Sequence, residues 1–317
     1  MTVAEPLASP RSRIAAGLLA GLAVEVSNLD TARAFYDRIL AGRGGRWQRE
    51  GGTLTYRLGS QHLDLVRRGS PRTFSDGGHH CAIPIEPDRL GPLVEELSTA
   101  GHAVDWWRED HPSERSVGPY VLDPSGNRVQ LIASANTDLL IDHAAIEIHH
   151  FDYCEYVYVN ALGGQVDYYH GWRSADLQEA KRWAAGDDPC APWTRRDNPH
   201  YRDFLVADPA TGQLRPSRHS VQSGGAEGRL RVPRPNGQLF IAYGPTRIVL
   251  VSATKVRQQP PEELIQGTPR LILAARQAAD VVAAGLDATP IAHERQGDSV
   301  YLRDPDGNFA EVLCSRG

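Results

Sequence analysis

Cysteine is scarce in this sequence, with four residues among 317. Cys81, Cys154, Cys190 and Cys314 are widely separated, and no two of them form a CxxC pair. This scatter does not fit the disulfide framework of a small secreted protein. We therefore expect reduced thiols that pack in the core of a cytoplasmic protein.

Long basic runs and long apolar runs are also missing. The net charge is −5 and no extended run of Lys or Arg occurs, so the sequence lacks the electrostatic footprint of a nucleic-acid-binding or membrane-surface protein. The longest apolar stretch near the N-terminus, residues 14–26, is too short for a membrane span. Residues 1–13 form a polar tail without the pattern of a signal peptide. These absences predict a cytoplasmic protein with small-molecule partners and no nucleic-acid or membrane partner.

An internal repeat is the strongest signal that the sequence does contain. LDPSGNRVQLI at 122–132 and RDPDGNFAEVL at 303–313 share an Asp-Pro-x-Gly-Asn turn and alternating apolar residues after it. Proline fixes φ, glycine accepts a positive φ, and the alternation is typical of a strand. A short apolar strand and then a helical pattern precede each copy. Each unit therefore runs strand, helix, strands, turn, strand.

Two further units complete the pattern. Residues 18–66 repeat the order of strand, helix and strands, and another unit begins at 141–150. The segment from about 152 to 235 fits this template poorly and indicates an expanded, irregular third module. With a length that favours about two domains, we predict an α+β protein of tandem βαβββ modules. The predicted parts are a polar tail at 1–13, an N-terminal domain at 14–135 with modules 14–67 and 77–135, and a C-terminal domain at 140–317 with an insertion at about 152–235.

The βαβββ repeats, the helix end AFYDRILAG and the two DPxGN turns resemble the vicinal oxygen chelate superfamily. This superfamily includes glyoxalase I, bleomycin-resistance proteins and type I extradiol dioxygenases. The resemblance covers the chain apart from most of 152–235. It implies curved sheets that surround a metal ion and a small molecule.

The resemblance also implies where metal ligands lie, on the first strand of one module and the last strand of its partner. The last-strand position, four residues after the turn glycine, is Glu311 in the C-terminal half and Gln130 in the N-terminal half. The first-strand position is Gly21 in the first module and His143 in the third. A neutral amide is a poorer ligand for a divalent cation than a carboxylate. The sequence therefore predicts a metal on His143 and Glu311 in the C-terminal half.

The first strand of the fourth module should also carry a metal ligand, but Arg270 occupies that position. A guanidinium group cannot ligate a metal, and we expect Arg270 to bind substrate instead. Glu147 and His149 share a strand face with His143 by the two-residue period of a strand. They are the predicted substitute ligands, together with His219 as a third choice, and a site without metal stays open.

A weaker site in the N-terminal half is the other option. His80 begins the second module, and Asp64 lies where the first module would carry its last-strand ligand. Together with Gln130 they could bind a metal, but structural roles for His80 and Asp64 are the favoured interpretation.

The run at 293–312 resembles type I extradiol dioxygenases. In that family a Tyr and a His upstream of the Glu ligand hydrogen-bond the catecholate and shuttle protons. The matching residues are Tyr301 and His293, the predicted catalytic pair. The same spacing recurs at Tyr120 and His111, so a Tyr301 that simply packs by its ring is equally open.

The middle segment is rich in large aromatic residues, among them Tyr158 and Trp172. We expect these two to line a substrate site for a small, flat, hydrophobic molecule. The core of the insertion or a dimer surface would also account for these aromatics, and a homodimer stays open.

These observations favour a metal-dependent oxidoreductase that resembles type I extradiol dioxygenases and acts on a small aromatic, catechol-like substrate. Fe(II) is the favoured metal, with Mn, Zn and Ni as alternatives, because imidazole and carboxylate bind all of them. A glyoxalase-like metal-dependent isomerase or lyase is the second hypothesis. A metal-free protein that binds a drug or metabolite is the third.

Overall fold

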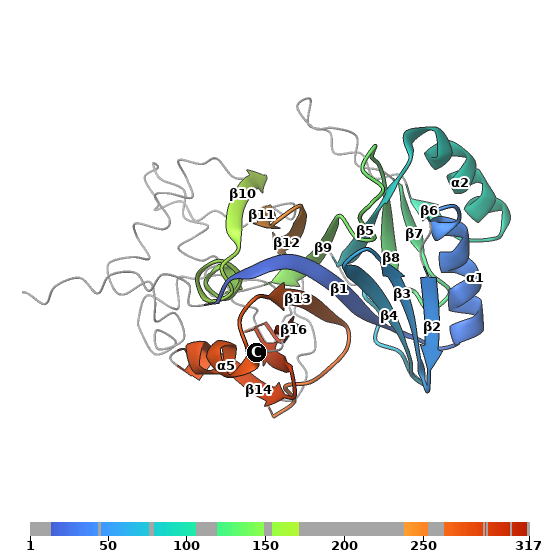
Figure 1. Cartoon of the computed structure of the whole chain (residues 1–317). Coiled ribbons are helices and arrows are strands. Elements are labelled where there is room, and N and C mark those ends of the chain that lie inside the picture. The colour runs from blue at the N-terminus through green and yellow to red at the C-terminus, as the bar shows by residue number, and fades with distance from the viewer. Residues whose placement is uncertain are drawn as a thin grey trace, which may run out of the picture.

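The computed structural model describes residues 14–43, 46–75, 79–105, 119–148, 154–170, 238–252, 263–287, 289, 291–304 and 306–315. Its strands form two eight-stranded sheets, and helices cover one face of each (Figure 1). The α+β class and the repeated βαβββ order predicted from the sequence are confirmed. Among the described residues, no helix is long and apolar enough to cross a membrane.

Four modules follow one another along the chain. The first contains β1 (Ala16–Val26), α1 (Leu29–Leu40), β2 (Arg46–Glu50), β3 (Thr53–Leu58) and β4 (Gln61–Arg67). The second contains β5 (His80–Ile85), α2 (Pro87–Thr99), β6 (Val104–Asp105), β7 (Tyr120–Leu122) and β8 (Arg128–Ala133). The third contains β9 (His143–Ile148), the π-helix η1 (Tyr156–Ala161), β10 (Gln165–His170), β11 (Gln238–Tyr243) and β12 (Thr246–Ser252). The fourth contains β13 (Arg270–Ala275), α5 (Ala279–Asp287), β14 (Ala292–Gln296), β15 (Ser299–Arg303) and β16 (Phe309–Leu313).

The two sheets pair the modules crosswise. Sheet A has the order β14-β15-β16-β13-β1-β4-β3-β2, and sheet B has the order β10-β11-β12-β9-β5-β8-β7-β6. Antiparallel pairing of β1 with β13 joins the first module to the fourth, and antiparallel pairing of β5 with β9 joins the second to the third. From the sequence we expected the third and fourth modules to share one ligand-binding cup. That expectation is wrong, because these modules lie in different sheets.

The turns nevertheless tie each half of the chain together. In the first Asp-Pro-x-Gly-Asn turn, the Asn127 amide donates to the Glu25 carbonyl at 2.9 Å, and its oxygen accepts from the Phe74 amide at 2.7 Å. In the second turn, the Asn308 amide donates to the Glu147 carbonyl at 3.4 Å. Each turn thus fastens the end of an even-numbered module to the first strand of the module before it. Figure 1 shows the first two modules on one side and the last two on the other, while the division of the chain at 135–140 stays a prediction.

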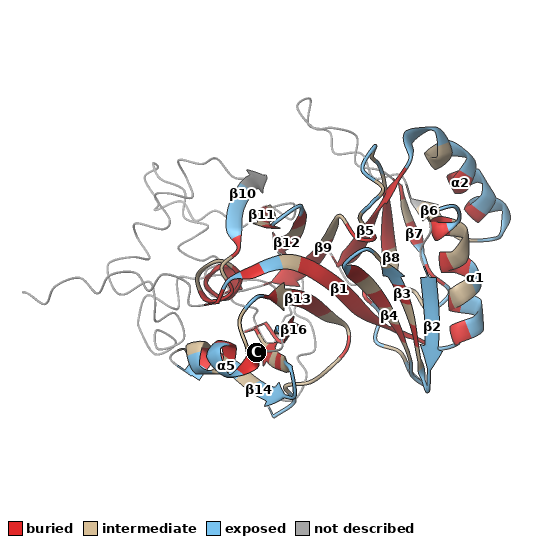
Figure 2. Cartoon of the chain, viewed as in Figure 1, coloured by how far each residue is buried: buried red, intermediate tan, exposed pale blue. Residues whose placement is uncertain are grey.

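The main core lies between the helices and the sheets. Asn28 is the N-cap of helix α1, and its side chain accepts from the amides of Asp30 and Thr31 at 2.8 and 3.1 Å. The inward face of α1 buries Phe35 and Tyr36 against the strands. Figure 2 shows the same division on both long helices, with buried residues toward the sheet and exposed residues outside. Cys81 and Cys154 are free and buried, as the sequence predicted for its thiols.

Gln61 joins the two sheets. Its side-chain amide donates to the Leu19 carbonyl at 2.8 Å and to the Ile141 carbonyl at 2.9 Å. Its oxygen accepts from the Leu140 and Ile141 amides at 2.8 and 3.1 Å. Leu19 belongs to β1 in sheet A, and residues 140–141 lead into β9 in sheet B. One buried side chain therefore uses its full hydrogen-bonding capacity across the sheet junction.

The described residues of the third module repeat one contact of the first module. Helix η1 occupies the place of α1, and Tyr158 OH donates to Asp304 Oδ2 at 3.2 Å, as Tyr36 OH does to Asp123 Oδ2 at 3.2 Å in the first half. Burial is the largest cause that raises the pKa of Tyr158, followed by the charge of Asp304. Tyr158 is fully buried in the main core, so it is not the substrate-binding residue that the sequence predicted. Residues 171–237, with Trp172, lie outside the described residues.

Candidate active site

Sheet B places two histidines and a glutamine on one face. Ala82 on β5 is in register with Gln130 on β8 and with His143 on β9, and His80 lies two residues before Ala82. Residues in register point to the same side of a sheet, and so do residues two apart on one strand. His80, Gln130 and His143 therefore share the face opposite the helices, which we call the helix-free face of sheet B.

The two imidazoles meet on this face. His80 Nε2 lies 3.2 Å from His143 Nε2. On the far side of its ring, His143 Nδ1 lies 2.8 Å from Asp142 Oδ1. A carboxylate there holds the proton on Nδ1 and turns the Nε2 lone pair toward His80. Burial alone would raise the pKa of Asp142, but the hydrogen bond and charge of His143, with the charge of Arg247, lower it below its ordinary value.

Gln130 contributes an unsatisfied oxygen. Its side chain is buried, with 3% of its surface exposed, and Oε1 has no hydrogen-bond partner among the described residues. An orphaned buried acceptor costs about 1–3 kcal/mol, which a ligand would recover. This cost marks the Gln130 oxygen as a position for a donor or a metal ion.

Apolar side chains surround the histidines. Tyr120 stands edge-on to the ring of His80 with centroids 5.2 Å apart, and Phe240 lies 6.4 Å from the ring of His143. A small apolar cluster of the same face adjoins them, separate from the main core and formed by Ala145, Val249, Val251 and Phe240. Two polar atoms beside an apolar wall are the common plan of a small-molecule site.

The donor set fits a divalent metal ion. Two imidazole nitrogens bound to one tetrahedral zinc at about 2.0–2.1 Å are about 3.3 Å apart, close to the 3.2 Å between His80 and His143. Gln130 Oε1 would be the third ligand. Within the described part of the chain, no group of three His, Cys, Asp or Glu residues could hold a metal ion. The ligand set is therefore two imidazoles and an amide oxygen, and it lacks a carboxylate.

The predicted pair His143 and Glu311 does not come together. His143 lies on β9 in sheet B, and Glu311 lies on β16 in sheet A. Glu147 shares the face of His143 but lies four residues further along β9, about 13 Å away at 3.3 Å per residue. His149 and His111 lie outside the described residues. The sequence placed His80 and Gln130 only in a weaker site. It did not reveal Asp142, although the pair Asp142-His143 at the start of a strand could have indicated it.

The remaining predicted residues lie in sheet A. Arg270 Nε donates to Glu311 Oε2 at 2.8 Å, and Ser299 donates to Glu311 Oε1 at 2.7 Å. Tyr301 is in register with Glu311, and its ring lies 5.6 Å from the Arg270 guanidinium. His293 is in register with Leu302, on the opposite face, and its Nε2 lies 3.3 Å from Asp287 Oδ1 of α5. The structure therefore separates His293 from Tyr301, and the predicted catalytic pair does not assemble.

The comparisons with solved structures agree with this architecture. Glyoxalase I from Zea mays matches with a TM-score of 0.55 at 14% sequence identity, over 93% of this chain and 91% of that chain. A candidate dioxygenase from Bacillus subtilis matches with a TM-score of 0.56 at 10% identity, over 97% of this chain and 87% of that chain. The chain has the vicinal oxygen chelate fold. No family model and no curated protein sequence matches it.

Sheet A contains the other positions at which the sequence resemblance implied ligands, Gly21, Arg270 and Glu311. Gly21 occupies the first-strand position of the first module, and a Cβ at Gly21 would lie 2.4 Å from the His62 carbonyl oxygen and 3.2 Å from the His62 ring. The imidazole of His62 thus lies where a first-strand side chain would be. With Arg270 paired to Glu311 at the neighbouring position, sheet A offers a polar cluster in place of a metal site.

The close approach at Gly21 leads to a prediction about stability. Gly21→Ala should lower the free energy of unfolding by about 2–3 kcal/mol, because backbone atoms of β4 must move to admit the methyl group. Gly17→Ala on the same strand is the matched control, since a Cβ there has no atom within 4 Å. Urea denaturation of both variants measures the difference. Equal stabilities would show that β4 yields without cost.

His62 leads to a prediction about pH. Burial lowers the pKa of His62 below its ordinary 6.5, with Asp64 acting in the opposite direction. The unfolded chain then binds the proton more readily than the folded one, so stability falls as the pH drops below about 6.5. We expect His62→Gln to flatten this decline between pH 7 and pH 5, measured by thermal unfolding. Identical pH profiles of the two proteins would contradict the assignment.

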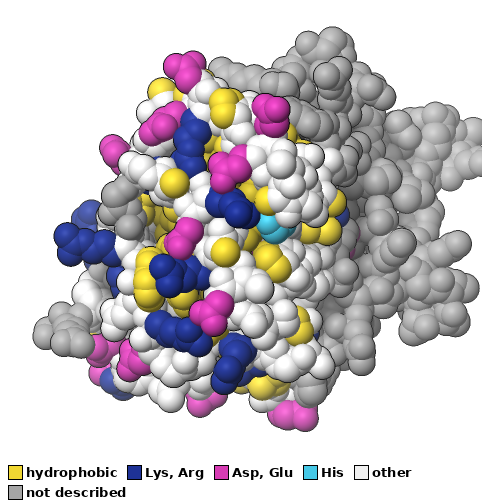
Figure 3. All heavy atoms as spheres, turned by 90° about the vertical axis from the view of Figure 1, so that its right-hand side faces the viewer, with side chains coloured by type: hydrophobic (Ala, Val, Ile, Leu, Met, Phe, Trp, Pro, Cys, Tyr) yellow, Lys and Arg dark blue, Asp and Glu magenta, His cyan; other side chains and the backbone are white. Residues whose placement is uncertain are grey.

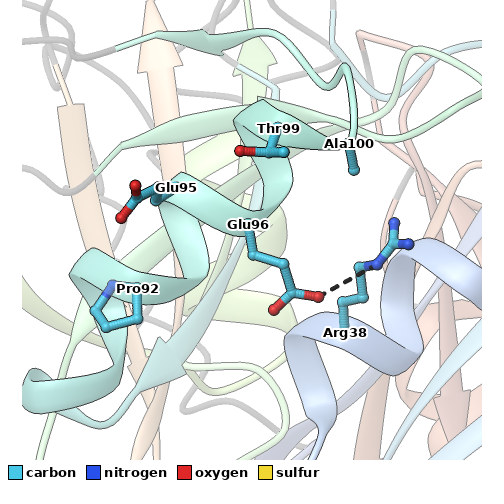
Figure 4. A pocket seen from close by; sticks show the side chains of 6 residues that line it. All are labelled: Arg38, Pro92, Glu95, Glu96, Thr99 and Ala100. Carbon is cyan, nitrogen blue, oxygen red and sulfur yellow. Dashed lines mark ion pairs between the residues drawn. The ribbon is translucent and has the colours of Figure 1, made fainter.

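The outer surface of the first two modules carries exposed charged side chains and an open hollow. On the face shown in Figure 3, basic and acidic side chains alternate without a large patch of one sign. An open hollow lies between α1 and α2, lined by Arg38, Pro92, Glu95, Glu96, Thr99 and Ala100 (Figure 4). The ion pair of Arg38 Nε with Glu96 Oε1 at 3.3 Å is exposed, and such pairs contribute little.

Proposed function

We propose that this protein is a metal-dependent enzyme whose metal is held by His80, Gln130 and His143 on sheet B. In this proposal it acts as a glyoxalase-like isomerase or lyase on a small oxygen-bearing substrate. The observation that carries the proposal is the 3.2 Å approach of His80 Nε2 to His143 Nε2. The unsatisfied Gln130 oxygen on the same face supports it.

The ligand set favours this chemistry over oxygen activation. Non-haem Fe(II) oxygenases use two His and one carboxylate, and the carboxylate expected for that role, Glu311, is bound to Arg270 in the other sheet. Imidazoles with an amide oxygen suit Zn, Ni or Mn as well as Fe. When bound, such an ion polarises a substrate oxygen and stabilises negative charge on it.

The protein's own residues would orient the ligands and the substrate. Asp142 fixes the tautomer and the ring orientation of His143. Tyr120 is half-buried and in register with Gln130, which favours a phenol that hydrogen-bonds a substrate beside the ligands. Phe240 and Val249 supply an apolar wall that excludes water. This wall supports a substrate with a flat apolar group, in line with the small aromatic molecule that the sequence favoured.

The proposal is tested with two substrate panels and four metals. Protein loaded in turn with Zn, Ni, Mn and Fe(II) is assayed for conversion of the thiol adducts of methylglyoxal and phenylglyoxal, and separately for oxygen uptake with catechols. We expect metal-dependent conversion of the adducts without oxygen uptake, and faster turnover of the phenyl substrate. Oxygen uptake confined to the Fe(II) form would instead support a dioxygenase. Protein that binds none of the metals would overturn both enzymatic proposals and leave a metal-free binding protein, in which His80 donates a hydrogen bond to His143.

A further inference from the structure

Sheet A carries opposed charges on its helix-free face, away from the proposed metal centre. Ala23 on β1 is in register with Asp64 on β4 and with Arg270 on β13. These three residues lie side by side on adjacent strands, so the Cα atoms of Asp64 and Arg270 are about 10 Å apart at about 4.8 Å per strand. Ala23 is fully buried between them, whereas the side chains of Asp64 and Arg270 keep 16% and 21% of their surface exposed. A ligand at this place would lie over the ends of these two side chains.

Arg270 is held in place with its outer end available. Its Nε donates to Glu311 Oε2 at 2.8 Å, and Ser299 fixes the other oxygen of that carboxylate at 2.7 Å. The ring of Tyr301 supports the guanidinium at 5.6 Å. Among the described residues, no hydrogen bond is given by its two terminal amino groups. A guanidinium anchored at Nε presents these groups to a planar anion.

Asp64 is anchored in a similar way on the other side. Thr55 donates to Asp64 Oδ1 at 2.7 Å, and His62 Nε2 lies 3.7 Å from Oδ2. No ion pair joins Asp64 to Arg270 in the described part of the chain, although their charges are opposite. The positive group and the acceptor are thus both fixed and kept apart, which leaves a gap that a small molecule carrying both complementary groups would bridge.

We infer that this cluster, formed by His62, Asp64, Arg270 and Glu311 on sheet A, is a second ligand site for small α-hydroxy or α-amino carboxylates. The carboxylate binds the terminal amino groups of Arg270, and the hydroxyl or ammonium group donates to Asp64. Two carboxylates already occupy the cluster, so a dianion such as phosphate is disfavoured against a monoanion. In this site the guanidinium supplies the fixed positive charge that a metal ion supplies in the proposed site of sheet B.

Calorimetric titration with four probes tests this inference: acetate, L-lactate, L-alanine and inorganic phosphate. To exclude binding at a metal on sheet B, the titrations use the His80→Ala/His143→Ala protein after treatment with a chelator. We expect lactate and alanine to bind more tightly than acetate, and phosphate to bind weakest. Saturable binding of none of the four probes would overturn the inference, and so would a preference for phosphate.

Variants of Arg270 and Asp64 test which side chains bind the ligand. Arg270→Lys keeps a positive charge beside Glu311 but loses the planar fork, and should weaken lactate binding at least about tenfold. Asp64→Asn should remove the preference for lactate over acetate. Arg247→Lys is the matched control, because Arg247 on sheet B also pairs with a carboxylate through Nε, at 2.7 Å from Asp167. Equal losses in the two Lys variants, with native circular dichroism in both, would show that lactate does not bind at Arg270.

Discussion

Replacement of His143 by Ala should remove the bound metal, whereas Glu311→Gln should leave the metal content unchanged. His143 supplies one of two imidazoles, and its loss leaves His80 with a neutral amide, a set too weak to retain a divalent ion through purification. Glu311 lies in the other sheet and accepts from Arg270 and Ser299, so its charge has no part in this site. Elemental analysis of the purified variants gives the metal content directly.

Three further measurements sharpen this test. His80→Ala should lose metal as completely as His143→Ala, and Asp142→Asn should lower the affinity about 10–100-fold, since it removes the carboxylate that orients His143. Metal should also raise the melting temperature of the wild type but not that of His143→Ala. If Glu311→Gln loses metal while His143→Ala retains it, the metal lies on sheet A and the proposed function fails.

Gln61→Leu should lower the free energy of unfolding by about 3–5 kcal/mol, the largest effect that we expect from a residue outside the ligand sites. Leucine fills the space but leaves the carbonyls of Leu19 and Ile141 and the amides of residues 140 and 141 without the partner that Gln61 provides. Because these groups are buried at the sheet junction, water cannot replace the lost bonds without opening it.

Chemical denaturation measures the effect, and Gln48→Leu provides the control. Gln48 lies on the exposed edge strand β2, and its substitution should change stability by no more than about 0.5 kcal/mol. A loss below about 1 kcal/mol for Gln61→Leu would mean that the two sheets are held together by other contacts. Thr246, whose hydroxyl accepts from the Leu19 amide at 2.9 Å, would be the first of these to examine.

The sequence predicted the module and its order because both depend on local chemistry. The turns around Asp123 and Asp304, the capped helix after Asn28 and the alternating strands all carry their signals within a few residues. The pairing of modules has no such local signal, because the first strand of each module has a free edge that can pair with the first strand of any other module. The contacts between the sheets, such as that of Gln61 with Ile141, join residues that are distant in sequence. They produce no repeated sequence pattern from which the pairing could be predicted.

The site was mispredicted for the same reason. The resemblance marked His80, Gln130, His143 and Glu311 as candidate ligand positions, but it could not say which of them face one another. When the third module is paired with the fourth, Glu311 becomes the expected partner of His143 and His80 is left with a structural role. The pairing of β5 with β9 reverses that assignment, because it sets His80 two residues from the partner of His143.

The crosswise pairing also affects how the chain is made. Leu19 on β1 is in register with Leu273 on β13. The apolar strand β1 is made early in synthesis, and its edge stays unpaired until most of the chain has left the ribosome. During that interval β1 exposes an edge of the kind that recruits other strands, and β5 exposes one until β9 has been made. We expect nascent chains to depend on chaperones until β13 emerges, and ribosomes stalled before residue 270 to carry aggregation-prone N-terminal halves. The crosswise pairing that brings the two histidines together thus carries a risk of aggregation in the cell, and this risk arises during translation.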